Sequence, residues 1–127
     1  MLAYSATKTE FLEDAPIIED LVLRKVRESL NISPGQSEIS SWRNSLGNAM
    51  ANILRDERIP NDSGVAIEYK LNSSRHRIDF LISGKDDFGR ENLLIIEFTL
   101  TLGSQLISVL IKLFRVIIPS MSFLTFT

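Results

Sequence analysis

Hydrophobic residues in the first third of the chain recur at helical spacing. Between Pro16 and Leu30 they fall in steps of three, four and one, which predicts one amphipathic helix with a single apolar face. The apolar positions of this face are Ile17, Ile18, Leu21, Val22, Val26 and Leu30. Asp14 is placed to cap this helix, and Pro16 suits its first turn.

A second helical stripe follows the segment 31–37, NISPGQS, which is a loop because it holds Pro, Gly and several turn-forming residues. We expect the second helix to begin near Ser37 or Ser40 and to end before Pro60. Its apolar positions are Trp42, Leu46, Ala49, Met50, Ile53 and Leu54. Trp42, the largest of these, is expected to fill the core.

The hydrophobic period changes to two after Gly64. Three short runs rich in β-branched and aromatic residues follow, at 65–71 (VAIEYKL), 77–82 (RIDFLI) and 93–99 (LLIIEFT). Their connections are short and dense in turn residues, so consecutive strands should be antiparallel. The sequence therefore predicts one α/β (α+β) domain, in which N-terminal helices cover a three-stranded antiparallel meander.

The composition changes near residue 98. All 16 acidic residues and 12 of the 14 Lys and Arg precede this point, and the last 30 residues carry only Lys112 and Arg115. The apolar run from Leu106 to Ile118 is shorter than the roughly 20 residues that span a bilayer, which makes a membrane span unlikely to form. We expect an apolar, helical tail that is buried or forms a homodimer, with binding to a membrane surface as an alternative.

The overall composition excludes several kinds of site. The chain has no cysteine and one histidine, so thiolate zinc sites are excluded and any metal must be held by oxygen. The net charge of −2 excludes binding of nucleic acid by bulk positive charge, and such a role needs a local basic site. The first residues lack the apolar segment of a secretory signal, so a cytoplasmic location is expected.

Acidic residues interrupt the apolar strand runs. Strand alternation places Asp79 on one face with Arg77, and Glu97 on one face with Thr99. A carboxylate in such a position is costly to bury unless it is paired or binds a metal. Because Mg²⁺ prefers one or two carboxylates plus water, Asp79 and Glu97 are a candidate Mg²⁺ site, with Glu68 as a third ligand.

Basic residues near these acids allow two other interpretations. Lys70, Arg75 and Arg77 flank the acids and could form cross-strand ion pairs at a sheet surface. The same three residues, together with Lys85, could instead contact phosphates in a nucleic-acid-binding module.

The order of these residues resembles the core of the PD-(D/E)xK nuclease superfamily, which has the restriction-endonuclease-like fold. The order in this sequence is a Glu, then R-I-D on a strand, a turn, and I-I-E at the end of the next strand. The segments SEISSWRNSLGNAMANIL, IPNDSGVAIEYKL and SSRHRIDFLISGKDDFGRENLLIIE resemble the nuclease-like N-terminal domain of bacterial proteins that continue into a P-loop, helicase-type ATPase domain. The resemblance covers residues 1–97 and implies an Mg²⁺-dependent nuclease acting on DNA or RNA.

The resemblance also implies roles for individual residues. Asp79 and Glu97 correspond to the acids that bind the metal. Glu68 corresponds to an additional acid, with Glu38 on the second helix as the alternative. Arg77 corresponds to the basic residue that precedes the aspartate.

The chain departs from this family pattern directly after Glu97. Relatives read I-I-E-L-K, whereas IIEFTLTL places Thr99 at the position of the catalytic lysine, and the chain contains no G-x-x-x-x-G-K-[ST] motif. We therefore hypothesise a truncated or frameshifted product, with a nuclease-like domain at 1–97 and a tail of other origin at 98–127. The alternative is a genuine divergent ending. The expected function is an impaired nuclease, or else a non-catalytic nucleic-acid-binding or interaction module of an ATPase or helicase system.

Overall fold

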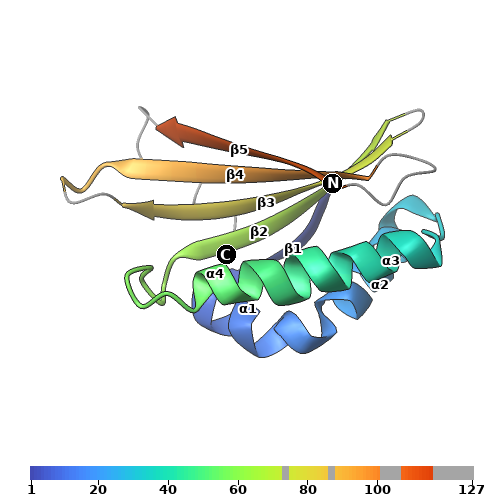
Figure 1. Ribbon diagram of the computed structural model, residues 1–127, viewed down its shortest axis with the longest axis horizontal. Coiled ribbons are helices and arrows are strands. Elements are labelled where there is room, and N and C mark those ends of the chain that lie inside the picture. Colours follow the sequence, from blue (N-terminus) through green and yellow to red (C-terminus); the bar gives the residue numbers. More distant parts are fainter. Residues whose placement is uncertain (73–74, 86–87, 101–106, 116–127) are drawn as a thin grey trace.

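The computed structural model describes residues 1–72, 75–85, 88–100 and 107–115, with side chains described for residues 1–71, 77–85 and 88–98. The described part forms two layers, a twisted antiparallel sheet and a set of helices that cover one face of it (Figure 1). The mixed α/β class predicted from the sequence is confirmed.

The described elements follow one another along the chain in three blocks: one strand, then the helices, then four strands. The first strand and the helices are β1 (Leu2–Thr7), α1 (Lys8–Asp14), the 3₁₀ turn η1 (Ala15–Ile17), α2 (Ile18–Leu30), α3 (Gln36–Trp42), the π-helix η2 (Arg43–Met50) and α4 (Ala51–Leu54). The later strands are β2 (Gly64–Asn72), β3 (Arg75–Lys85), β4 (Glu91–Leu100) and β5 (Ile107–Arg115).

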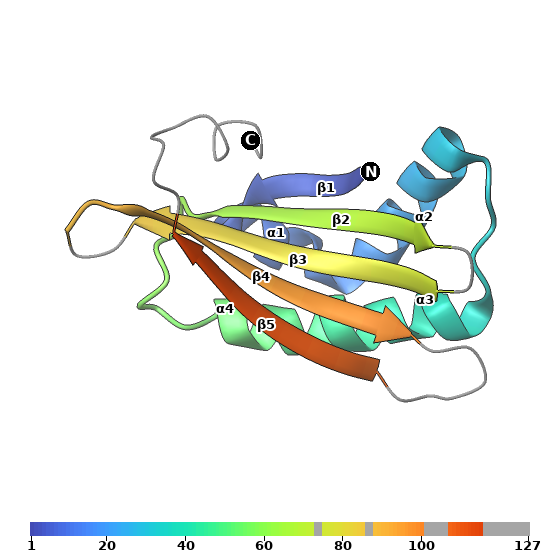
Figure 2. The same ribbon diagram turned by 90° about the horizontal axis from the view of Figure 1, so that it is seen from above.

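The sheet has five strands in the order β1-β2-β3-β4-β5, and each pairs with the next in antiparallel fashion (Figure 2). The predicted meander is confirmed as β2-β3-β4, but the expectation of only three strands is wrong. Strand β1 escapes the sequence pattern because its two buried residues, Ala3 and Ala6, are small and weak strand formers.

The expectation of a helical tail is also wrong for the part of the tail that the structure describes. Residues 107–115 form β5, which pairs with β4 along its length. A short apolar run does not distinguish a helix from a strand by periodicity alone, and the β-branched Ile107, Val109 and Ile111 favour the strand. Strand β4 crosses residue 98, so the change in composition falls inside a strand. Among the described residues, no helix has both the length and the hydropathy needed to cross a membrane.

The sequence pattern did not predict helix α1, which is the first helix of the block and has an N-cap of its own. Thr7 caps it through a capping box with Glu10. The predicted cap by Asp14 is wrong, because the Asp14 carboxylate makes no cap hydrogen bond and instead accepts one from the Tyr4 hydroxyl at 2.7 Å. Helix α2 buries Ile18, Val22 and Val26 of the predicted stripe, whereas Ile17 and Leu30 of the same stripe are exposed.

The second predicted helix forms, but its middle is a π-helix, and this changes which residues are buried. A π-turn holds more residues than an α-turn, so positions four apart come into line. Trp42, Leu46, Met50 and Leu54 are all buried, at intervals of four, whereas Ile53 is 49% exposed. An α-helical period had placed Ile53 on the apolar face.

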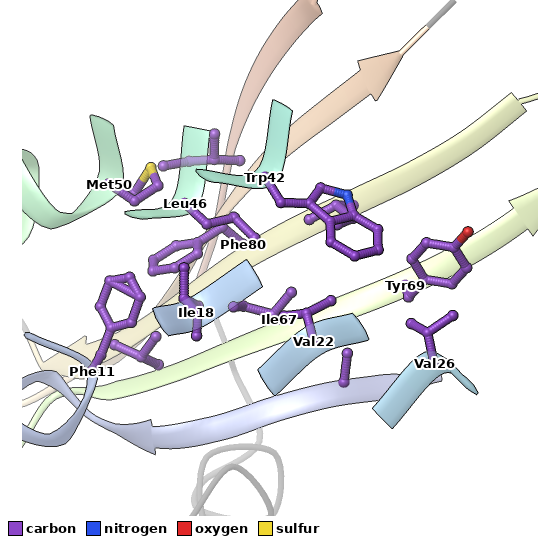
Figure 3. Close-up of a cluster of buried hydrophobic side chains, with 14 of the residues drawn as sticks. Phe11, Ile18, Val22, Val26, Trp42, Leu46, Met50, Ile67, Tyr69 and Phe80 are labelled. Carbon is purple, nitrogen blue, oxygen red and sulfur yellow. The ribbon is translucent and has the colours of Figure 1, made fainter. Parts of the chain in front are cut away.

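The core lies between the helices and the inner face of the sheet, which we define as the face toward the helices (Figure 3). Phe11 of α1 packs edge-to-face on Phe80 of β3, with ring centroids 5.1 Å apart. Trp42 packs edge-to-face on Tyr69 of β2 at 5.9 Å, and its burial confirms the prediction. Since Ile67, Tyr69 and Phe80 point inward, the residues alternating with them belong to the other face.

Candidate functional site

The candidate site lies on the outer face of the sheet, opposite the helices. On β3 the core residues Ile78 and Phe80 flank Asp79, so alternation places Asp79 outward. On β2 the core residues Ile67 and Tyr69 flank Glu68 in the same way. The central strands of the meander therefore project acids away from the hydrophobic core.

Three acids stand side by side across three neighbouring strands. Glu68 on β2 is the register partner of Asp79 on β3, and Asp79 is the register partner of Glu97 on β4. Directly opposed residues in an antiparallel pair share one face, with Cβ atoms about 5 Å apart. We call Glu68, Asp79 and Glu97 the carboxylate row. The strand phase read from the sequence predicted this juxtaposition, and the register provides it.

A second row lies two residues further along the same strands. Lys70 on β2 is the partner of Arg77 on β3, and Arg77 is the partner of Thr99 on β4. Thr99 therefore lies directly opposite Arg77 in the register. On the other side of β4, the backbone register places Leu110 opposite Glu97 and Lys112 opposite Ile95.

Asp79 is the most buried member of the carboxylate row, at 3% exposure. Its Oδ2 atom lies 3.3 Å from Lys70 Nζ and accepts a hydrogen bond from Arg77 Nη2 at 3.3 Å. Its Oδ1 atom lies 3.1 Å from Arg77 Nε, but the two atoms do not align as a hydrogen bond. Within the described part of the chain, Asp79 Oδ1 is therefore a buried carboxylate oxygen that lies near positive charge but accepts no hydrogen bond.

Glu68 is more exposed than Asp79 and its ion pair is longer. Its Oε1 atom lies 3.7 Å from Lys70 Nζ, and both side chains are more than one-third exposed. An ion pair in such contact with water contributes little to stability, typically about 0–1 kcal/mol. Lys70 thus bridges Glu68 and Asp79. Its pair with Asp79 crosses from β2 to β3, as one interpretation of the sequence suggested, whereas its pair with Glu68 lies within β2.

Two residues proposed from the sequence lie elsewhere. Glu38, the alternative for the additional acid, is on α3 and accepts a hydrogen bond from the Tyr69 hydroxyl at 3.1 Å. Since Tyr69 points to the inner face, the sheet separates Glu38 from the carboxylate row. Lys85 is eight residues from Arg77 on the same strand, about 27 Å along β3, so it does not join Lys70 and Arg77. The Arg75 side chain lies outside the described side chains.

Both tyrosines, the buried Tyr69 and the partly buried Tyr4, have pKa values well above the usual range. Burial is the main cause for Tyr69, followed by the negative charge of Glu38 and the hydrogen bond to it. Burial also leads for Tyr4, with the hydrogen bond and charge of Asp14 adding to it. Both hydroxyls therefore remain protonated donors at neutral pH.

The carboxylate row can be tested for its fit to Mg²⁺ on these contacts. Within the described ranges, no group of three or more Asp, Glu or His side chains is gathered closely enough to hold a metal ion. A pair remains, since Asp79 and Glu97 are register partners and no described residue donates a hydrogen bond to Asp79 Oδ1. Mg²⁺ is commonly held by one or two carboxylates with water filling the other positions, so the pair fits this ion.

Sequence reasoning missed a pocket at the opposite end of the sheet. It has a volume of about 290 Å³ and is lined in part by Asp62, Ser63, Ser83 and Lys85. Ser83 Oγ accepts a hydrogen bond from Gly64 N at 3.1 Å, which ties the start of β2 to β3. The Ser83-Gly84 break in an apolar strand was the available signal.

Comparisons with protein-family models, with curated proteins and with solved structures give no significant match to this chain.

Proposed function

We propose that this chain is a divergent PD-(D/E)xK-type nuclease domain with the restriction-endonuclease-like fold, in which metal binding is retained and cleavage of DNA or RNA is impaired. The observation that supports it best is the register pairing of Asp79 with Glu97 on the outer face of the sheet. The helix-then-meander order and the position of Thr99 opposite Arg77 agree with the sequence resemblance.

In this proposal Asp79 and Glu97 hold Mg²⁺ and Glu68 extends the negative region beside them. When bound, Mg²⁺ supplies Lewis-acid stabilisation of the charge that develops on a phosphodiester. Lys70 and Arg77 lie two residues further along their strands and are 38% and 30% exposed as side chains, so both can reach a phosphate. Their role is to orient the phosphodiester next to the acids.

The impairment follows from Thr99. A lysine at this position would add a fixed positive charge on the face that carries Glu97, whereas a threonine hydroxyl is neutral. A preorganised group that stabilises developing charge is typically worth about 3–4 kcal/mol, or roughly a hundred- to thousandfold in rate. We expect cleavage by the natural sequence to be slow or absent.

The test compares the wild-type chain with Thr99→Lys and with Thr99→Lys/Asp79→Asn on single-stranded DNA, double-stranded DNA and RNA, with Mg²⁺ or Mn²⁺. The proposal predicts that Thr99→Lys gains cleavage and that Asp79→Asn removes the gain. Glu28→Gln, an exposed charge change on α2, is the matched control and should change nothing. If Thr99→Lys binds nucleic acid but cleaves no faster than wild type, the nuclease assignment is contradicted.

A non-catalytic nucleic-acid-binding or interaction module is the second candidate. The observation that favours it is the ion pairing of Lys70 and Arg77 with Asp79, because a carboxylate occupied by two cations is a poor metal ligand. In the same assay this candidate predicts binding by every variant, cleavage by none, and no requirement for a divalent cation.

A further inference from the structure

We infer that Asp79 is an internal competitor for phosphate, holding Lys70 and Arg77 so that the two cations become available to a phosphodiester only when the Asp79 charge is neutralised. The inference rests on the proposed function for its ligand, a nucleic-acid phosphodiester. It adds a regulation of that site, in which binding of a divalent cation and binding of nucleic acid are coupled.

The first support is that both cations converge on one carboxylate. Lys70 Nζ and Arg77 Nη2 each lie 3.3 Å from Asp79 Oδ2, and Arg77 Nε lies 3.1 Å from Oδ1. A carboxylate and a phosphate present the same kind of anionic oxygens to a guanidinium or an ammonium group. While Asp79 is charged, a phosphate must therefore displace it.

The second support is that the Asp79–Arg77 ion pair leaves hydrogen-bonding groups of both residues unused. Arg77 Nε and Asp79 Oδ1 are both buried, and neither makes a hydrogen bond to a described residue. An ionised pair with an unused donor and an unused acceptor leaves free energy to be gained by a ligand that aligns better. A phosphate can accept from Arg77 Nε, while a cation can bind Asp79 Oδ1.

The third support is accessibility. Asp79 is nearly closed to solvent, whereas the side chains of Lys70 and Arg77 keep 38% and 30% of their surface. The cations can thus turn toward an incoming phosphate while Asp79 stays in place. Since a divalent cation competes with Lys70 and Arg77 for the same oxygens, it should release them, and coupling between two ligands is reciprocal.

The experiment measures anisotropy of a fluorescent single-stranded oligonucleotide in EDTA, with the full chain as wild type, Asp79→Asn and Glu28→Gln. We expect Asp79→Asn to bind about three- to tenfold more tightly than wild type, although it removes a proposed metal ligand. Its salt dependence should steepen by about one phosphate contact, a slope change near −0.7. Glu28→Gln makes the same change in net charge on the far side of the sheet and should bind as wild type does.

A triple variant, Asp79→Asn with Lys70→Met and Arg77→Met, should lose the tighter oligonucleotide binding if Lys70 and Arg77 make the additional phosphate contacts. Equal or weaker binding by folded Asp79→Asn overturns the inference, and so does retention of the gain in the triple variant. If Asp79→Asn does not fold, the wild-type chain decides: the inference requires millimolar Mg²⁺ to tighten oligonucleotide binding, and weaker binding overturns it. Loss of the proposed function is visible separately, as absence of Mg²⁺ binding by calorimetry.

Discussion

Asp79 and Glu97 face each other across the β3-β4 pair, on the side of the sheet that the helices leave uncovered. Asp79 is 3% exposed and lies close to two cations, and its Oδ1 atom accepts no hydrogen bond from the residues that the structure describes. Burying a carboxylate is costly, and a single ion-pair network on an apolar strand is a poor stabiliser. Under the proposed function, cation binding is the reason that an acid stands at this point.

Lys8 should be essential for the stability of the segment that follows α4. Its side chain is buried, and Nζ donates hydrogen bonds to the backbone carbonyls of Asp56 at 2.8 Å and Ile59 at 2.7 Å. We expect Lys8→Met, which keeps most of the stem and removes the donor, to lower the free energy of unfolding by about 2 kcal/mol. Urea denaturation measures this, with the exposed Lys25→Met as control. Equal stability of the two variants would show that the contacts contribute nothing.

The stability of the fold should decrease at alkaline pH because the two tyrosines ionise more readily in the unfolded chain. Both tyrosines have pKa values raised above 10.0, by burial first and by Glu38 and Asp14 next. In the unfolded chain the tyrosine hydroxyls ionise near pH 10, whereas in the folded protein they stay protonated. The contribution of the protonated tyrosines to the free energy of unfolding is therefore fully present below pH 10 and declines as the pH rises above it.

Ultraviolet absorbance at about 295 nm follows the phenolate directly. We expect no phenolate signal from the native protein until it unfolds, and a flatter alkaline loss of stability in Tyr69→Phe. Reversible titration of a native tyrosine near pH 10 would contradict this account.

Gly47 should be required by the packing of the π-helix. A Cβ at this position would lie 3.1 Å from the Ala15 carbonyl oxygen and 3.5 Å from Ile18 Cγ2. In an open helix Gly→Ala stabilises by roughly 1 kcal/mol, but here we expect Gly47→Ala to destabilise by about 1–3 kcal/mol. Thermal unfolding compares it with Gly35→Ala, where nothing lies within 4 Å of an added Cβ. A more stable Gly47→Ala would contradict the close contact.

The juxtaposition of the acids was predictable because strands fix side-chain direction with a period of two. Short connections make consecutive strands antiparallel, so the phase of Asp79 and Glu97 could be read from their neighbours. The partners of Asp79 were only partly predictable, since Lys70 and Arg77 were named but their convergence on one carboxylate depends on side-chain conformation.

Other features depend on tertiary contacts and could not be predicted from the hydrophobic pattern of the sequence. The π-helix shifts the buried face by a fraction of a turn, which no α-helical period can show, so Ile53 was misplaced. Glu38 has the right residue type for a metal ligand, but Tyr69 binds it on the inner side of the sheet. The periodicity of the β5 residues does not distinguish a helix from a strand, and their pairing with β4 makes them a strand.

Calorimetric titration of Mg²⁺ into the full chain at neutral pH, with wild type, Asp79→Asn, Glu97→Gln and Glu28→Gln, tests the central claim most directly. The account predicts one Mg²⁺ site in the wild type that is retained in Glu28→Gln and weakened at least about tenfold in both Asp79→Asn and Glu97→Gln. Absence of binding by the wild type, or equal binding by Asp79→Asn, would contradict it.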